Sequence, residues 1–565
     1  MNYIIGISYG HHESSCTLIS SNGDLVYIRE EWLSRVKNDY RFPIFSLNFL
    51  KDNFLNLEEN LISICLFEKP LKNWLGIGLK KNLSVLNYLN KLRQFKKSDI
   101  YFEKEIKKVF KSLPEILYCP HHLSHIYSSE LLLRKNEPNT LNLVFDGYGE
   151  GLSGVIYKGQ GDKIRLLKQY QTKSSFGLLY SALTEWIGFS PNEDEYKVMA
   201  LAGYGLPIYE EYITKNIIFY DEENLNLEIN QNFFNFIDSG KPTIKISFEK
   251  KFGRLDKNLP ILEQTNIINV ITSFQNIIEN TISNLIKKLI SKNSDSKQII
   301  LSGGLFHNSK LVGELTRRID FPIFVSPTPG DAGSSIGAAY FAMLCNKKNY
   351  LRVGKPNPYI GPKLESLKNY DHLFKQIENK NTFSKVLEIL NDDQIISIFS
   401  GYCEVGPRAL LSRSLCCNAE SKKALLKLNI IIKKRESFRP IAPVISTKYL
   451  HKFFDFNPDS IENSFWMGQL IWPKKTTDTK KMPFCHIDKS VRAQVYDENN
   501  VVHKQNVPLI IQKLLKENFI LANTSLNIAG DPMVFFPEDL YINCKRLEIK
   551  YIMQENNLFE LINDN

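Results

Sequence analysis

Short apolar runs that end in turns rich in glycine and serine open the chain. Residues 3–8 and 16–19 are largely apolar and flank a polar stretch of Gly, His and Ser, and a third run covers 25–28. Apolar runs of this length, bounded by turn residues, are typical of strands, so we expect three successive strands here. A turn of this composition can direct backbone N–H groups towards a phosphate.

Two later stretches repeat the arrangement. Residues 144–157 predict a strand, a glycine-rich turn and a strand, and residues 299–309 predict a strand that ends in Gly-Gly and leads into a helix. The spacing of Ile and Leu across 260–292 predicts a long helix, and residues 174–186 predict a capped amphipathic one. Two strand–turn–strand loops followed by a strand–Gly-Gly–helix loop resemble the superfamily of actin, sugar kinases and heat-shock ATPases.

A pair of histidines between these loops suggests a metal site. His121 and His125 are four residues apart, a spacing that places both imidazoles on one face of a helix. Asp146 follows an apolar run and would offer a carboxylate at the end of a strand. Two His and one carboxylate suit iron, manganese or zinc. The alternative is that the close histidines only pack or face solvent after a turn.

Asp331 begins a small-residue helix after the Pro/Gly loop at 327–330. It is either a fourth metal ligand or an ordinary helix N-cap.

The second half of the chain carries basic residues within predicted strands and turns. Guanidinium and ammonium groups in such places suit a polyphosphate. The alternative is ion pairing with acids such as Glu404 and Glu436. The residues are Arg408, Arg413, Lys433, Arg435, Arg439 and Arg492.

Composition limits the classes of protein to consider. A chain of 565 residues is too long for one core, and the composition shift over 346–362 indicates a junction between a domain at 1–350 and one at 351–565. The net charge of +10 permits anionic substrates, but no basic arm or stripe indicates nucleic acid. Nine scattered cysteines without C-x-x-C, no signal peptide and no membrane-length apolar run predict a cytoplasmic protein.

The motifs together resemble one family, the O-carbamoyltransferases that modify antibiotics, nodulation factors and related sugars. Matching segments extend from Ile5 to about Glu538. They are Gly6-Ile-Ser-x-x-x-His12-x-Ser-Ser, Arg35-x-Lys37 with Phe42-Pro43, the H-x-x-x-H pair, Asp194-Glu-Tyr-Lys-Val-Met, Gly303-Gly-x-x-x-Asn308, Gly330-Asp-Ala-Gly, Gly406-Pro-Arg-Ala-Leu, Arg435-Glu-x-Phe-Arg-Pro and Asn523-Thr-Ser-x-Asn. Glu13, Val405 and Leu411-Ser412 depart from the family pattern, but none of these changes removes a charged or metal-binding group.

This resemblance implies an α/β protein of two domains. The first would be a duplicated actin-like domain similar to tRNA threonylcarbamoyl transferases, and the second an α/β domain similar to threonylcarbamoyl-adenylate synthase. The second domain would make carbamoyl adenylate from carbamoyl phosphate and ATP. The first would transfer the carbamoyl group to a hydroxyl of a small-molecule or sugar acceptor, in natural-product or glycan tailoring.

The resemblance also assigns roles to residues. His12 would be the general base and Lys37 would contact the phosphate or carbamoyl oxygen. Fe²⁺ or a similar divalent metal would be bound by His121, His125, Asp146 and Asp331, and Mg²⁺ would accompany ATP. ATP and carbamoyl phosphate would be bound by Gly303, Gly304, Asn308, Arg408, Lys433, Arg439, Arg492, Asn523 and Ser525.

Two alternatives remain, a kinase or ATPase of the actin-like superfamily and a tRNA threonylcarbamoyl-type enzyme. The first leaves the histidine pair and the second-half cations without a role, and the second does not fit a chain without a nucleic-acid surface. The sequence predicts no membrane partner and leaves a homodimer open. It does not identify the acceptor, whose contacts we expect in the loops at 66–112 and 206–260.

Overall fold

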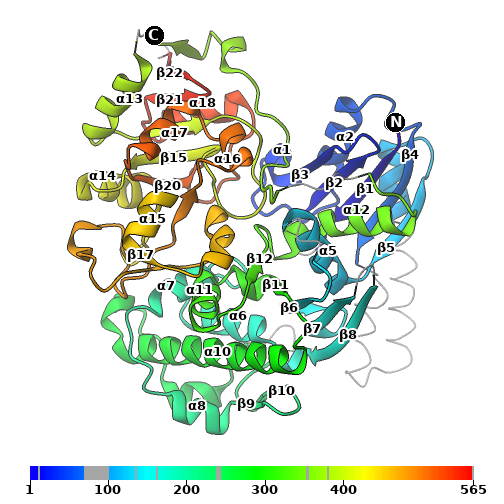
Figure 1. Cartoon of the computed structure of the whole chain (residues 1–565), viewed down its shortest axis with the longest axis vertical. Coiled ribbons are helices and arrows are strands. Elements are labelled where there is room, and N and C mark those ends of the chain that lie inside the picture. Colours follow the sequence, from blue (N-terminus) through cyan, green and yellow to red (C-terminus); the bar gives the residue numbers. More distant parts are fainter. Residues whose placement is uncertain are drawn as a thin grey trace.

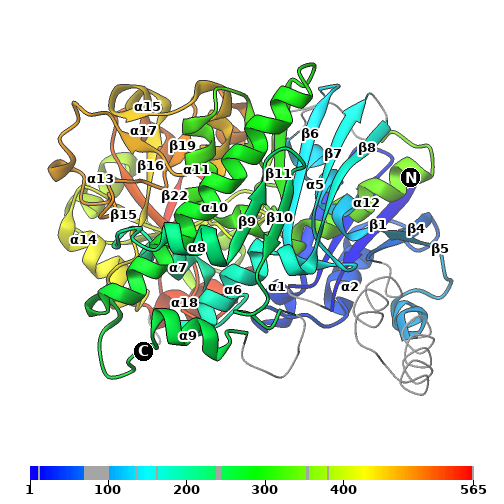
Figure 2. The same ribbon diagram turned by 90° about the horizontal axis from the view of Figure 1, so that it is seen from below.

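The fold is seen in a computed structural model of the chain (Figures 1 and 2). It describes residues 1–10, 13–68, 101–133, 137–160, 163–236, 243–350, 355–377 and 381–562.

Two five-stranded sheets with the same strand order occupy the first half (Figure 1). The orders are β3-β2-β1-β4-β5 and β8-β7-β6-β11-β12. In each sheet the first three strands pair antiparallel and the last two extend it in parallel. The duplicated order is that of the actin-like fold, so this prediction is confirmed. The strands are β1 (Tyr3–Ser8), β2 (Ser15–Ser20), β3 (Leu25–Arg29), β4 (Leu61–Phe67), β5 (Glu115–Cys119), β6 (Thr140–Gly149), β7 (Leu152–Gln160), β8 (Lys163–Gln171), β11 (Gln298–Ser302) and β12 (Ile323–Val325).

Helix α12 (Ser334–Cys345) packs closely against both α5 (His121–Leu133) and β1. A Cβ on Gly337 of α12 would lie 1.8 Å from the carbonyl oxygen of Ser124, and a Cβ on Gly6 would lie 2.0 Å from that of Ser335. Glycine at these two positions therefore permits the close approach. It brings the first turn of α5 next to the loop that precedes α12.

The second sheet shares its core with the helices that follow it (Figure 2). The long helix predicted over 260–292 is α10 (Thr265–Lys292), and the capped one is α6 (Phe176–Trp186), whose N-cap Ser175 accepts from the Leu178 N–H at 3.0 Å. Nearby elements are α7 (Glu195–Leu201), α8 (Glu210–Asn216), β9 (Ile218–Asp221), β10 (Asn226–Ile229), α9 (Ile246–Phe252) and α11 (Ser309–Arg318).

An eight-stranded mixed sheet forms the second half, in the order β13-β22-β21-β14-β15-β20-β16-β19. One face packs against α13 and α17, and the other contributes to a core shared with α14, α18 and the first half. The predicted α/β class of this half is confirmed, whereas the division at 350/351 stays a prediction. The elements are β13 (Phe374–Gln376), α13 (Thr382–Asn391), β14 (Ile396–Phe399), β15 (Arg413–Asn418), α14 (Lys422–Leu426), β16 (Ala442–Ser446), α15 (Thr447–Phe453), β19 (Gln494–Tyr496), α16 (Val501–Asn506), α17 (Leu509–Lys516), β20 (Leu521–Ser525), α18 (Pro537–Arg546), β21 (Tyr551–Gln554) and β22 (Asn557–Leu561).

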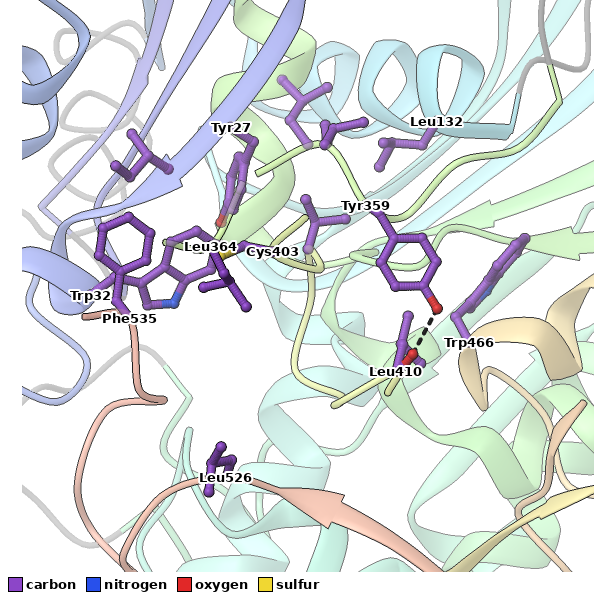
Figure 3. Close-up of a cluster of buried hydrophobic side chains, with 14 of the residues drawn as sticks. Tyr27, Trp32, Leu132, Tyr359, Leu364, Cys403, Leu410, Trp466, Leu526 and Phe535 are labelled. Carbon is purple, nitrogen blue, oxygen red and sulfur yellow. Dashed lines mark hydrogen bonds between the residues drawn. The ribbon is translucent and has the colours of Figure 1, made fainter. Parts of the chain in front are cut away.

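The two halves share one hydrophobic core (Figure 3). Trp32, on α1 (Glu30–Ser34) of the first half, stacks on Phe535 of the second with ring centroids 6.0 Å apart. The guanidinium of Arg413 lies 4.2 Å from the Trp32 ring, and its Nε donates to Glu404 Oε2 at 3.0 Å. Arg413 is fully buried. Its ion pair confirms, for this residue, the alternative of structural pairing.

Among the described residues, no helix is long and apolar enough to cross a membrane.

Candidate metal and anion sites

Three elements bring four ligand-type side chains together. His121 and His125 lie on the first turns of α5, Asp146 lies near the end of β6, and Asp331 begins the 3₁₀ turn before α12. The two Nε2 atoms are 3.3 Å apart. Each is near Asp146 Oδ2, at 3.2 Å from His121 and 3.1 Å from His125, and His125 Nε2 is 3.3 Å from Asp331 Oδ1. One ligand atom from each residue lies within 4.8 Å of all the others.

Backbone amides orient the Asp146 carboxylate. The N–H groups of Gly147 and Gly304 donate to its Oδ1 at 2.7 and 3.2 Å, which leaves Oδ2 directed at the two imidazoles. A Cβ on Gly304 would lie 2.8 Å from this Oδ1, and a Cβ on Gly303 would lie 2.2 Å from the Phe145 carbonyl oxygen. The Gly-Gly turn, which we expected at a nucleotide, therefore lies against the histidine–aspartate cluster.

Glu68, at the end of β4, was missed by the sequence analysis. Its Oε2 lies 2.8 Å from His121 Nδ1, and both side chains are buried. A carboxylate on Nδ1 fixes the imidazole so that Nε2 is the atom presented to a metal. In the sequence, Glu68 is only an acid directly after an apolar strand. Its role can be inferred once β4 is known to pair with β5, because β5 leads into α5.

The pKa values of His121, His125 and Asp146 are shifted by their neighbours in the cluster. Burial alone would lower the pKa of His121, but the carboxylates of Asp146 and Glu68 raise it well above its ordinary value. The pKa of His125 is raised as well, against the effect of burial, by Asp146 and Asp331. Burial favours the neutral acid of Asp146, yet the two imidazoles hold its pKa well below the ordinary value. Two buried imidazoles this close, facing two carboxylates, are matched to a shared cation.

The donor set fits a divalent transition metal. Such an ion lies about 2.0–2.1 Å from an imidazole nitrogen, so two nitrogens 3.3 Å apart can share one ion. Asp331 Oδ1 is buried without a hydrogen bond among the described residues, although it lies in ion-pair range of both histidines. His₂Asp₂ with a carboxylate behind one His suits iron, manganese or zinc.

We expect Glu68→Gln to weaken metal binding by roughly 10–100-fold, the range for substitutions behind a metal ligand. The neutral amide still accepts a hydrogen bond from His121 but no longer polarises the ring. A chelator-competition titration measures the effect, with Glu58→Gln, a partly exposed acid paired with Lys51, as the matched control. Unchanged metal affinity would show that Glu68 does not act through His121.

A second cluster consists of basic side chains of the second half. Among the described residues, Arg408, Lys433, Arg435 and Arg492 have no carboxylate partner. Burial lowers the pKa of Arg408 to about 10, and burial with Arg439 and Arg492 lowers that of Arg435 to about 9. The pKa values of Lys433 and Arg492 are lowered well below their ordinary values, by burial and by the neighbouring cations. Lys433 is buried and the three arginines are half-buried. Cations withdrawn from water normally have partners, so this cluster suits an anion.

Asn523 and Ser525 of β20 lie at this cluster, and their role in binding ATP and carbamoyl phosphate stays a prediction. Lys433 Nζ donates to the carbonyl oxygens of Ser525 and Asn527 at 3.0 and 2.6 Å. The amide of Asn523 donates to Gln494 and to the Ala409 carbonyl, and its buried Oδ1 accepts no hydrogen bond from the residues that the structure describes. Arg439 differs from the unpaired cations because it binds Glu436 at 3.1 Å.

The remaining predicted residues, Asn308, Lys37 and His12, differ in what the structure says of them. Asn308 caps α11 by accepting from Leu311 N–H at 2.9 Å and donates to Gln275 at 2.8 Å, so both ends of its amide have protein partners. Lys37 pairs with buried Glu31 at 3.1 Å and contributes to the lowered pKa of Lys433, which places it near the cation cluster. His12 lies outside the described residues. The roles of all these residues stay predictions.

His307 lies between the two clusters. Its carbonyl oxygen accepts from Arg408 Nη2 at 3.2 Å. Burial lowers the pKa of its imidazole to about 4, and the charges of Arg408, Asp146 and His125 act on the same ring. The histidine–aspartate cluster and the cation cluster are therefore neighbours across the boundary between the halves.

Comparison with known proteins now gives these sites a context. The family model described as the carbamoyltransferase N-terminus matches residues 3–340, and the carbamoyltransferase C-terminus matches residues 387–560. The chain belongs to the carbamoyltransferase family. It is thus a carbamoyltransferase-family enzyme, as predicted, and carbamoyl donor and acceptor substrates are implied.

Relatives of this carbamoyltransferase cover most of its length. Uncharacterized protein sll1178 of Synechocystis sp. is 28% identical and spans 98% of this chain and 96% of its own. Nodulation protein NolNO of Sinorhizobium fredii is 29% identical over 74% of this chain, which covers 60% of that protein. Nodulation protein NolO of Bradyrhizobium diazoefficiens is 27% identical over 73% of this chain and 74% of its own.

Solved structures resemble the carbamoyltransferase only at a distance. Component A of the (R)-2-hydroxyglutaryl-CoA dehydratase of Acidaminococcus fermentans has a TM-score of 0.32 at 13% identity, over 62% of this chain and 100% of that chain. HypF of T. kodakarensis has a TM-score of 0.31 at 14% identity, over 62% of this chain and 48% of that chain. The fold assignment of the carbamoyltransferase therefore rests on its own strand order.

Proposed function

We propose that this enzyme is an ATP-dependent O-carbamoyltransferase that works in two steps. In the first, carbamoyl phosphate, ATP and one water give carbamoyl adenylate, pyrophosphate and inorganic phosphate. In the second, the hydroxyl oxygen of an acceptor attacks the carbamoyl carbon, the bond to the adenylate oxygen breaks, and AMP leaves. The acceptor class, a small-molecule or sugar hydroxyl, comes from the family resemblance.

One observation carries the proposal: cations that have no carboxylate partner among the described residues lie next to a metal-type cluster, in a chain whose two halves match the carbamoyltransferase family. A kinase of the actin-like superfamily needs one nucleotide site between its two duplicated sheets. It has no use for a second anion site in an added eight-stranded domain.

The cations of the second half bind the polyanionic substrates of the first step. Arg408, Arg439 and Arg492 supply guanidinium forks for phosphate oxygens, and Lys433 supplies a compact charge. Asn523 and Ser525 complete this site. Mg²⁺ enters with ATP.

The first half performs the transfer. His121, His125, Asp146 and Asp331 would hold Fe²⁺ or a similar ion, which supplies positive charge to the adenylate phosphate. His12 takes the proton of the acceptor hydroxyl, because an alcohol is a poor nucleophile until a base removes that proton. Lys37, near Lys433, binds the oxygen on which negative charge develops.

The test omits the acceptor. Purified protein is mixed with ATP, carbamoyl phosphate and Mg²⁺, and the products are identified by mass spectrometry. We expect carbamoyl adenylate with pyrophosphate, and neither product when carbamoyl phosphate is left out. Formation of ADP and phosphate alone would instead favour a kinase or ATPase, and the proposal would fail.

A further inference from the structure

Helix α7 carries a motif that the proposed roles leave unused. Asp194-Glu-Tyr-Lys-Val-Met lies in the first half of the chain, yet its Tyr196 and Lys197 contact Arg439 and Glu436 of the second half. The Tyr196 ring lies 4.4 Å from the guanidinium carbon of Arg439. Lys197 Nζ lies 2.8 Å from Glu436 Oε1.

Glu436 pairs with both Lys197 and Arg439 and so connects the two contacts. Its Oε1 binds Lys197 from the first half, and its Oε2 binds Arg439 Nη1 at 3.1 Å. Arg439 is therefore fixed from two sides by consecutive residues of α7, through a ring face and through a carboxylate. The side chains of Lys197 and Arg439 are only 15% and 18% exposed.

Other neighbours of Lys197 fix it in turn. Its Nζ lies 3.1 Å from Asp194 and 4.7 Å from the centre of the Phe189 ring. Burial alone would lower its pKa, but Glu436 and Asp194 raise it, so the ammonium group keeps its charge. An ion pair held this way loses little side-chain freedom when Glu436 binds.

The same helix closes a small cavity of about 60 Å³ at the anion site. Its lining includes Tyr196, Met199 and Ala200 of the first half and Arg435, Arg439 and Arg492 of the second. The Nε atom of Arg492 is buried and has no hydrogen-bond partner in the described part of the chain. Three guanidinium groups around one small pocket suit a phosphate group.

We propose that Lys197 and Glu436 are positioning residues that orient Arg439 towards a phosphate group, so that the anion site of the second half is completed by α7 of the first. The inference rests on the proposed function, because the anion site is that of the adenylate-forming step. It adds that this step depends on a contact made by the other domain. Neither residue touches the substrate.

The variant Glu436→Gln distinguishes a role of Glu436 in positioning Arg439 from an effect of its negative charge alone. Removing a negative charge beside an anion site should strengthen anion binding if only the local field matters. Positioning predicts the reverse, because Lys197 and the amide no longer hold Arg439. We expect Glu436→Gln to weaken pyrophosphate binding about tenfold, the effect of one charge-assisted hydrogen bond. Isothermal titration of the full-length protein with pyrophosphate measures it.

Lys197 variants complete the experiment. Lys197→Met should weaken pyrophosphate binding to a similar degree and raise KM for ATP in adenylate formation, while Lys197→Arg should keep most of the wild-type affinity. Lys215→Met is the matched control, since Lys215 forms an exposed ion pair with Glu211 in the first half. The control should bind pyrophosphate like the wild type.

The outcomes distinguish the two proposals. If the wild type binds pyrophosphate and Glu436→Gln binds it equally or more tightly, the positioning role is wrong and the proposed function stands. If Lys197→Met loses metal and thermal stability along with pyrophosphate affinity, α7 is only a structural contact and the inference also fails. If the wild type neither binds pyrophosphate nor forms carbamoyl adenylate, the proposed function itself fails.

Discussion

Asp146→Asn is expected to abolish metal retention and carbamoyl transfer while leaving carbamoyl-adenylate formation intact. The amide keeps the shape of the side chain and its acceptor oxygen for the Gly147 N–H, but it loses the charge that faces both imidazoles. Loss of a direct ligand should exceed the roughly 10–100-fold effect of residues behind a ligand. Metal content per chain, measured by elemental mass spectrometry after dialysis, reports the first effect.

Asp295→Asn is the matched control for this variant. Asp295 is an exposed carboxylate that pairs with Lys158, so the same chemical change there should leave the metal in place. Pyrophosphate release with ATP and carbamoyl phosphate should match the wild type in both variants. A metal-free Asp146→Asn protein that also failed to form carbamoyl adenylate would show that the two sites are not separate.

Arg492→Met is expected to abolish carbamoyl-adenylate formation without lowering the melting temperature. No hydrogen bond or ion pair of this side chain occurs within the described part of the chain, and its Nε is buried. Burial of an unpaired charge opposes folding, so an apolar side chain of similar length should be neutral or stabilising. Pyrophosphate release and differential scanning calorimetry give the two readouts.

Arg413→Met, in contrast, should lower the melting temperature. Arg413 is fully buried, whereas Arg492 is half-buried; Glu404 pairs with Arg413, and Trp32 covers its guanidinium. Removing one partner of a buried ion pair costs about 3–5 kcal/mol, so this variant should melt well below the wild type. A stability loss in Arg492→Met as large as that in Arg413→Met would mean that Arg492 has a structural role rather than an anion-binding one.

Local spacing in the sequence was enough to predict some of these features. The His-x-x-x-His spacing and an aspartate at the end of an apolar strand predicted residues that the fold does bring together, because helix and strand geometry alone set their directions. Repeated strand–turn–strand patterns likewise predicted the duplicated sheets. These inferences needed no knowledge of contacts between distant segments.

Features that depend on the packing of distant segments could not be predicted. Glu68 gained a role only from the position of β4 next to the strand that leads into α5. Arg413 and Arg492 look alike in the sequence, both within predicted strands or turns, and only the position of Glu404 separates them. The contact of Lys197 with Glu436 joins the two halves, so no local sequence pattern predicts it.

The shared core around Trp32 sets a rule for building chimeras of this enzyme and its relatives. Trp32 belongs to the first half, but Phe535 and Arg413, which cover its ring, belong to the second. A chimera made by exchanging whole halves at the junction near residue 350 would place Trp32 of one parent against the residues at 413 and 535 of the other. Recombinants that exchange acceptor preference should therefore carry residues 30–34 together with the segments around Arg413 and Phe535 from a single parent.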